Sequence, residues 1–288
     1  KVNTGSIGGY EQDIDFIAPT VTVTTTDGGH AYLKTTSTNF LTLGPSSIDG
    51  SLTLSTAGDL TLGSVTAGDS LYLTAGGSLG FSSISTVNSL SLSAGSALEL
   101  GSVNAGGTLS LATTGSGGGV TQTDSVTAAH LTATLAGTSS QLNLGTHSNA
   151  IASLGPITAP GGFSLSNGNT STTVSSNIST TSGGVNIDVG TGTYTHNANV
   201  TVSTGLGADI AITADNMAIG NHNDYRAFNG GQNLILKPHT ASRGITLGGS
   251  SETDGQLVLQ SAELEAFRAG GQTVTIGSDS ATGTMTIG

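Results

Sequence analysis

A short repeat is the feature that most constrains how this chain can fold. Residues 50–68, 69–87 and 88–106 align without gaps, and leucine recurs at the same places in each. Every repeat contains apolar pairs of the form L-x-L, which place both side chains on one face of a β-strand. A repeat this short can bury its apolar face only against the same repeat above and below it. The sequence therefore predicts a stack of coils around a continuous core.

The repeat predicts three columns of stacked core side chains. The columns are Leu52, Leu71, Leu90 and Leu109; Leu60, Leu79 and Leu98; and Val65, Ile84 and Val103. The first column also extends backward at the same spacing through Leu33 to Ile14. Glycine-containing turns such as Ala-Gly-Asp separate the apolar pairs, as expected where the chain needs positive φ. We therefore expect regular 19-residue coils over the range 14–111.

The period lengthens after residue 111. The range 112–130 is rich in glycine and is expected to form an irregular loop or distorted coil, with Val120 and Val126 buried. Over 131–288, the apolar pairs predict longer, 21–25-residue coils, as far as Leu257 and Leu259. The whole range 1–288 is predicted to be one all-β domain, a parallel β-helix or β-solenoid of about 13 coils. We expect it to be right-handed, because crossovers between parallel strands almost always are.

One short helix is predicted near the C-terminal end. The range 261–270 begins with Ser261 as a candidate N-cap, has acidic residues in its first turn and ends at a glycine. Leu264 and Phe267 lie one helical turn apart and are therefore expected to pack together onto the solenoid.

The distribution of charge restricts the partners that the chain can have. Its net charge is −12, and no lysine or arginine occurs between residues 35 and 225. Nucleic acids and anionic membrane surfaces both require cations, so neither is an expected partner. No apolar run is long enough for a transmembrane helix, and membrane insertion is not expected. Because cysteine is absent, disulfides and thiolate metal sites are excluded.

The sequence contains weak matches to known functional patterns. Residues 76–80 match the nucleophile pattern G-x-S-x-G, but they lie inside a β-repeat with no helix predicted after them. Glu263 and Glu265 are the only close pair of glutamates, and a short helix would point them apart. Runs of threonine such as 20–26 would suit an ice-binding face only if they recurred in one register, which they do not. We predict no catalytic, cofactor or metal site, so a polysaccharide-degrading β-helix enzyme ranks third among the functional hypotheses.

The range 220–229 is the most polar and least repetitive part of the chain. It contains the candidate binding residues His222, Asp224, Tyr225, Arg226 and Phe228. One imidazole and one carboxylate fall short of the three or four ligands of a usual metal site. A solvated loop between coils is therefore the favoured interpretation. If the loop contacts a partner, its aromatic and cationic side chains supply the contacts.

The 19-residue lines resemble the repeats of filamentous haemagglutinin and related large exoproteins of two-partner secretion. Three further stretches are similar to recurring segments of such proteins: 149–159 with 161–165, 210–219, and 257–264 with 274–277 and 283–287. The resemblance implies a right-handed parallel β-helix, export through an outer-membrane partner transporter, and a place on the bacterial cell surface. It also implies a role in adhesion, aggregation or biofilm. Some relatives carry a C-terminal toxin, and the family's N-terminal secretion domain is not seen in this sequence.

Two functional hypotheses follow from these observations. The first is the structural shaft of a secreted adhesin, whose partner is a glycan or protein on a host or neighbouring cell. The second is a subunit of an extracellular filament in which solenoids stack end to end. The second hypothesis arises because no polar capping coil is visible in the sequence, and an uncapped solenoid end is an open sheet edge.

Overall fold

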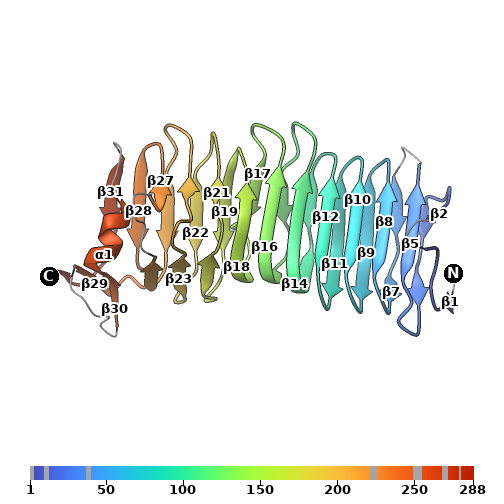
Figure 1. Ribbon diagram of the computed structural model, residues 1–288, viewed down its shortest axis with the longest axis horizontal. Helices are drawn as coiled ribbons and strands as arrows, with labels where there is room; N and C mark the ends of the chain where they lie inside the picture. The colour runs from blue at the N-terminus through green and yellow to red at the C-terminus, as the bar shows by residue number, and fades with distance from the viewer. Residues whose placement is uncertain are drawn as a thin grey trace. The chain divides into compact units, whose positions relative to one another are not determined.

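The structure is a computed structural model that describes residues 3–9, 13–36, 40–220, 226–248, 255–267, 272–278 and 280–288. Nearly all of its regular structure is β-strand, and each ladder strand pairs in parallel with a strand from another turn of the chain. This arrangement confirms the predicted β-solenoid (Figure 1). The right-handed sense and the number of coils remain predictions. The chain divides into two compact units, Lys1–Ser140 and Gln141–Gly288.

The first unit consists of short strands. They are β1 (Asn3–Thr4), β2 (Ile14–Asp15), β3 (Thr20–Val21), β4 (Thr24–Thr25), β5 (Ala31–Thr35), β6 (Leu41–Leu43), β7 (Ser46–Ile48), β8 (Leu52–Thr56), β9 (Leu60–Ala67), β10 (Leu71–Ala75), β11 (Leu79–Thr86), β12 (Leu90–Ala94), β13 (Leu98–Leu100), β14 (Ser102–Thr113), β15 (Val120–Gln122) and β16 (Val126–Leu135).

The three predicted columns are confirmed in this unit. Leu71 pairs with Leu52 on one side and Leu90 on the other, which fixes the length of the coil as predicted. The other two columns pair with the same spacing. All ten predicted column residues are at most 2 % exposed. Burial alternates along the strands, as in Leu52–Thr56, so one face of each strand lines the core.

The N-terminal extension of the first column was wrong in register. Leu33 pairs with Leu54, and Ala31 pairs with Leu52, so this coil is slightly longer than the regular ones that follow it. Ile14 pairs with Leu33 as predicted, but it is 44 % exposed. A shift from Leu52 to Leu54 keeps the same side chains facing the core, because side-chain direction repeats at every second position. The inward pattern alone therefore cannot distinguish the two registers.

The range 112–130 contains a lengthened coil, most of which is paired. Val120 pairs with Leu98 and Val126 with Val103, so both spacings exceed the regular period. Both valines are buried, as predicted. The glycine-rich stretch 114–119 forms the turn between β14 and β15 and accommodates the added length.

Close stacking explains why the corners are rich in glycine. The N–H group of Gly95 donates to the carbonyl of Ala75 in the preceding coil, over 2.8 Å. A Cβ atom at Gly95 would lie 1.8 Å from the carbonyl oxygen of Gly76, which is far inside van der Waals contact. Residues with side chains cannot occupy this stacked corner without moving the backbone.

The second unit consists of further strands and one short helical segment. They are β17 (Gln141–Leu144), β18 (Ala150–Thr158), β19 (Gly162–Ser166), β20 (Thr172–Val174), β21 (Ile178–Ser179), β22 (Val185–Asp188), β23 (Thr193–His196), β24 (Val202–Ser203), β25 (Ile210–Thr213), β26 (Asn216–Ile219), β27 (Phe228–Asn229), β28 (Asn233–Lys237), β29 (Gly244–Leu247), β30 (Gln256–Leu259), α1 (Ser261–Leu264), the 3₁₀ turn η1 (Glu265–Phe267), β31 (Thr273–Ile276) and β32 (Met285–Ile287).

The longer coils of this unit follow the predicted spacings up to β28. Leu142, Phe163, Val185, Ile210 and Leu234 pair in succession at the predicted intervals and form one buried column. The extra residues lie in the turns, so the strands keep their register.

The predicted continuation from Leu234 to Leu257 was wrong. Leu234 pairs with Val274, which lies beyond Leu257 in the chain. Leu257 instead pairs with Ile245, which also pairs with Met285, and these strands form a separate sheet in the order β30-β29-β32. The segment between β28 and β31 thus leaves the ladder. An L-x-L pair specifies a strand and its buried face, but it does not specify which neighbour the strand joins.

The predicted helix is present but shorter, and it begins one residue earlier. Its N-cap is Gln260, where Ser261 was expected. The backbone N–H of Gln260 donates to Glu263 Oε2 over 2.8 Å, which secures the first turn. Phe267 is buried, and its ring lies 5.9 Å from that of Phe228, which confirms that it packs on the solenoid. Leu264 is half-buried, and the expected end of the helix at residue 270 lies outside the described residues.

Candidate functional site

The predicted binding loop divides into residues outside the described ranges and residues with known positions. His222, Asp224 and Tyr225 lie outside the described residues. Arg226 is exposed, and its carbonyl oxygen accepts a hydrogen bond from Thr201 Oγ1 over 3.3 Å. Among the candidate binding residues that the structure describes, Arg226 is therefore the one at the surface.

Phe228 was named as a contact residue for the case in which this loop binds a partner, but the structure buries its side chain. It is 1 % exposed and lies in β27, where it pairs with Val202 of the core column. Its ring centre lies 5.0 Å from that of His196. Strand β27 begins inside the predicted loop 220–229. Side chains alternate between the two faces of a strand, and Phe228 lies on the face that points into the core.

Tyr194 and His196 form a buried polar pair that the sequence analysis missed. Both residues belong to β23, and both side chains are fully buried. Tyr194 Oη lies 2.9 Å from His196 Nδ1, and His196 Nε2 lies 2.9 Å from the carbonyl oxygen of Val200. A carbonyl can only accept, so Nε2 donates to it and Nδ1 accepts from the tyrosine hydroxyl. The pair is thus a buried, hydrogen-bonded part of the core.

Tyr194 should make the protein sensitive to alkali. Burial raises its pKa above the ordinary value near 10. Its contribution to stability is therefore complete below about pH 10 and is lost as the pH rises further, because the unfolded chain ionises first. We expect Tyr194→Phe to lower the free energy of unfolding at pH 8 by about 1–3 kcal/mol, since His196 Nδ1 loses its donor. The variant should also show a shallower loss of stability between pH 9 and about 11 in urea titrations. Tyr72→Phe at the surface is the control, and an equal effect there would contradict the assignment.

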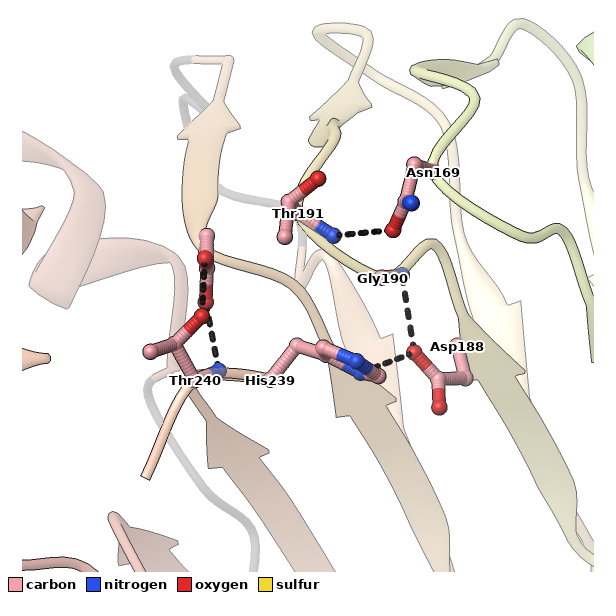
Figure 2. A network of polar contacts seen from close by, with 7 residues as sticks. Asn169, Asp188, Gly190, Thr191, His239 and Thr240 are labelled. Carbon is pink, nitrogen blue, oxygen red and sulfur yellow. Dashed lines mark hydrogen bonds and ion pairs between the residues drawn. The ribbon is translucent and has the colours of Figure 1, made fainter. Parts of the chain in front are cut away.

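A cluster of polar side chains lies at or just after the ends of the strands β19, β22, β25 and β28. We call Asn169, Asp188, Asp215, His239 and Thr240 the polar corner (Figure 2). Asp188 Oδ1 accepts from the backbone N–H of Gly190 over 2.8 Å and lies 3.2 Å from His239 Nδ1. Both of these side chains are exposed. They form a surface ion pair whenever the imidazole is protonated, and such pairs contribute little to stability.

The remaining contacts of the polar corner join successive coils. Asn169 Oδ1 accepts from the N–H of Thr191 over 3.1 Å, as Figure 2 shows. The buried carboxylate of Asp215 accepts from Thr240 N over 2.7 Å and from Thr240 Oγ1 over 2.6 Å. Each acceptor satisfies a turn N–H of a following coil, which is a structural task. Among the described residues, no group of three His, Cys, Asp or Glu side chains lies close enough together to hold a metal ion.

A related arrangement occurs at a corner of the first unit. Asp69 accepts hydrogen bonds from Asn88 Nδ2 over 2.6 Å and from Ser51 Oγ over 2.8 Å. These hydrogen bonds lower the pKa of the Asp69 carboxyl group, with Asn88 as the largest cause. Asp69 follows the turn glycine Gly68, and its side chain links three successive coils.

A shallow hollow lies on the outer face of β17, β19, β22 and β25. Its volume is about 400 Å³. Four successive coils place Gln141, Gly162, Gly184 and Asp209 at the same position of the sheet, in that order. The two middle coils have glycine there and therefore lack a side chain. Asp209 Oδ1 already accepts from the N–H and the side-chain amide of Asn233. The hollow thus has a polar rim and a floor of glycine backbone.

A second hollow of about 600 Å³ lies on the face of β9, β11 and β13. It forms where Gly80 pairs with Thr61 and Glu99, both of which point outward. The G-x-S-x-G match at 76–80 lies beside it. This segment leads into β11 instead of a helix, and Ser78 Oγ contacts Ser96 Oγ at 2.8 Å. The strand-to-helix turn that a nucleophile elbow requires is absent from this segment.

Comparisons with protein-family models, curated proteins and solved structures found no match. No helix among the described residues has the length and apolar character needed to cross a membrane. The resemblance to filamentous haemagglutinin-like exoproteins therefore rests on the repeats themselves.

Proposed function

We propose that the chain is a non-catalytic structural shaft of a secreted bacterial surface adhesin, which mediates attachment or aggregation. The observation that supports this proposal is the in-register ladder of parallel coils within each unit. Its core consists of stacked aliphatic side chains, and its outer faces are mostly small and uncharged. On the face of β8, β10 and β12, the outward residues Thr53, Tyr72 and Ser91 stand side by side. A solenoid of this kind can serve as an extended shaft with a regular surface.

The proposed partner is a glycan or protein on a host or neighbouring cell. Hydroxyl and amide groups on the outer faces suit neutral hydrogen-bonding ligands, and Tyr72 adds an aromatic ring that is 45 % exposed. An extracellular place on the bacterial surface and export through an outer-membrane transporter follow from the resemblance described above.

A direct binding assay tests this proposal. The purified chain is applied to immobilised neutral glycans and to fixed bacterial and epithelial cells, and bound protein is quantified. Saturable binding to at least one surface is expected, with affinity that falls when Tyr72→Ala or Arg226→Ala removes an exposed contact group. Ser110→Ala, which removes only a small outward hydroxyl, is the matched control. Absence of saturable binding to every surface would contradict the adhesin proposal.

The second candidate, a filament subunit, is favoured by exposed apolar side chains in both units. Ile17 in the first unit is 91 % exposed, and Ile287 in the second unit is 80 % exposed. Electron microscopy over a concentration series separates the two candidates. Fibres that lengthen with concentration support a filament, whereas separate particles at every concentration support the shaft.

A further inference from the structure

The strands β26 and β27 are the last members of their ladders among the described residues. β26 pairs with β23, and β27 pairs with β24, but neither pairs with a later described strand. The N–H of Gly220 points back to the carbonyl of His196 over 2.7 Å. Because successive N–H groups of a strand alternate in direction, the N–H of Ile219 points away from the preceding coil. An edge with such groups is a template for another parallel strand.

Groups from the helical segment occupy this edge. The N–H of Ile219 donates to Glu263 Oε1 over 2.7 Å, and the N–H of Ala227 donates to the carbonyl of Ala266 over 3.3 Å. Glu263 is 8 % exposed, so its carboxylate is desolvated to reach this contact. Figure 1 shows α1 on the C-terminal side of β27 and β28. A carboxylate and a helical carbonyl therefore take hydrogen bonds that the next coil would otherwise accept.

On β27, the side chain of Gln272 also takes the place of a strand from a next coil. Its Oε1 accepts from the N–H of Gly230 over 3.0 Å, and its Nε2 donates to the carbonyl of Phe228 over 3.4 Å. In a parallel ladder, one residue bonds in this way to the two residues that flank its partner. The side-chain amide of Gln272 thus makes the two hydrogen bonds that a residue of the next coil would make if it were paired with Asn229. The ring of Phe267 also packs against that of Phe228, with 5.9 Å between the ring centres.

We propose that Glu263, Phe267 and Gln272 form an edge cap that prevents a second copy of this chain from adding a parallel strand to β26 and β27. The cap does not depend on the proposed attachment function, since it concerns only the edge of the second unit. It consists of side-chain substitutes for a coil, so removing them should expose the edge without disturbing the ladders beneath it.

The test is the double variant Glu263→Ala/Gln272→Ala, studied by hydrogen exchange and by sedimentation velocity over a range of concentrations. Amide exchange at Ile219 and Gly230 is expected to be about tenfold faster than in the parent chain. The sedimenting mass is expected to at least double at high concentration in the variant, while the parent remains a single species.

Glu265→Ala is the matched control, because this glutamate is on the same segment as Glu263 and its side chain is exposed. It should behave as the parent does in both measurements. The proposal is overturned if the folded double variant stays monomeric, if the two amides exchange at the parent rate, or if the parent associates equally well. Should the double variant fail to fold, Gln272→Leu alone is tested by amide exchange at Gly230 and by sedimentation velocity, with the same expected results.

Discussion

Replacing Leu92 with alanine is expected to lower the free energy of unfolding by about 2–5 kcal/mol. Leu92 is 1 % exposed and lies in the middle of a column, paired with Leu73 on one side and Leu111 on the other. Truncation would leave a cavity between two coils whose backbones are fixed by hydrogen bonds. The coils cannot collapse into the space, so the cost should lie toward the upper end of the range.

Urea denaturation measures this effect, and the neighbouring residue provides the control. Ser91 is on the same strand but points outward, so Ser91→Ala should change the free energy of unfolding by no more than about 0.5 kcal/mol. Equal losses for Leu92→Ala and Ser91→Ala would contradict the alternation of inward and outward faces on which the solenoid depends.

Replacing Asn167 with alanine is expected to cost about 2–4 kcal/mol in the second unit. Asn167 is fully buried. Its Oδ1 accepts from the N–H of Ile151 over 2.8 Å, and its Nδ2 donates to the carbonyl of Ile151 over 2.9 Å. The same amide nitrogen also donates to the carbonyl of Thr170 over 3.1 Å and to Thr172 Oγ1. Alanine would leave the N–H of Ile151 buried without an acceptor.

Hydrogen exchange at Ile151 together with urea denaturation checks this result. The amide of Ile151 should exchange faster in Asn167→Ala, and the unfolding midpoint should fall. Asn186→Ala is the matched control, because Asn186 is exposed on β22 and its removal should have an effect within about 0.5 kcal/mol. If both asparagine variants unfold at the parent midpoint, the hydrogen bonds between Asn167 and Ile151 do not stabilise the fold.

The core could be predicted from sequence because identical spacing and L-x-L pairs define both the strands and their buried faces. Register was predictable only where the spacing repeated without change. Leu33 could join Leu52 or Leu54 with the same side chains facing inward, and the structure selects Leu54. Leu257 has the pattern of a column residue, yet it pairs with Ile245, because an inserted helix and two strands interrupt the ladder.

The candidate sites were less predictable because they depend on which coils lie next to each other. The sequence placed Phe228 in a polar loop, whereas in the structure it lies in β27 beside the ring of His196. The hollow over Gly162 and Gly184 becomes visible only when the two residues are aligned in register. Gln272 substitutes for a peptide group through side-chain geometry, which no spacing in the sequence indicates.

The identical register of β8, β10, β12 and the end of β14 has a consequence for inheritance. Residues 71–89 form one complete coil, so their deletion would join Ser70 to Leu90 at a position equivalent to Leu71. Recombination between neighbouring repeats in the gene can thus add or remove whole coils, of about 4.8 Å each, while the remaining core residues keep equivalent neighbours. In this part of the chain, the length of the solenoid can therefore change by one coil at a time while the fold stays the same.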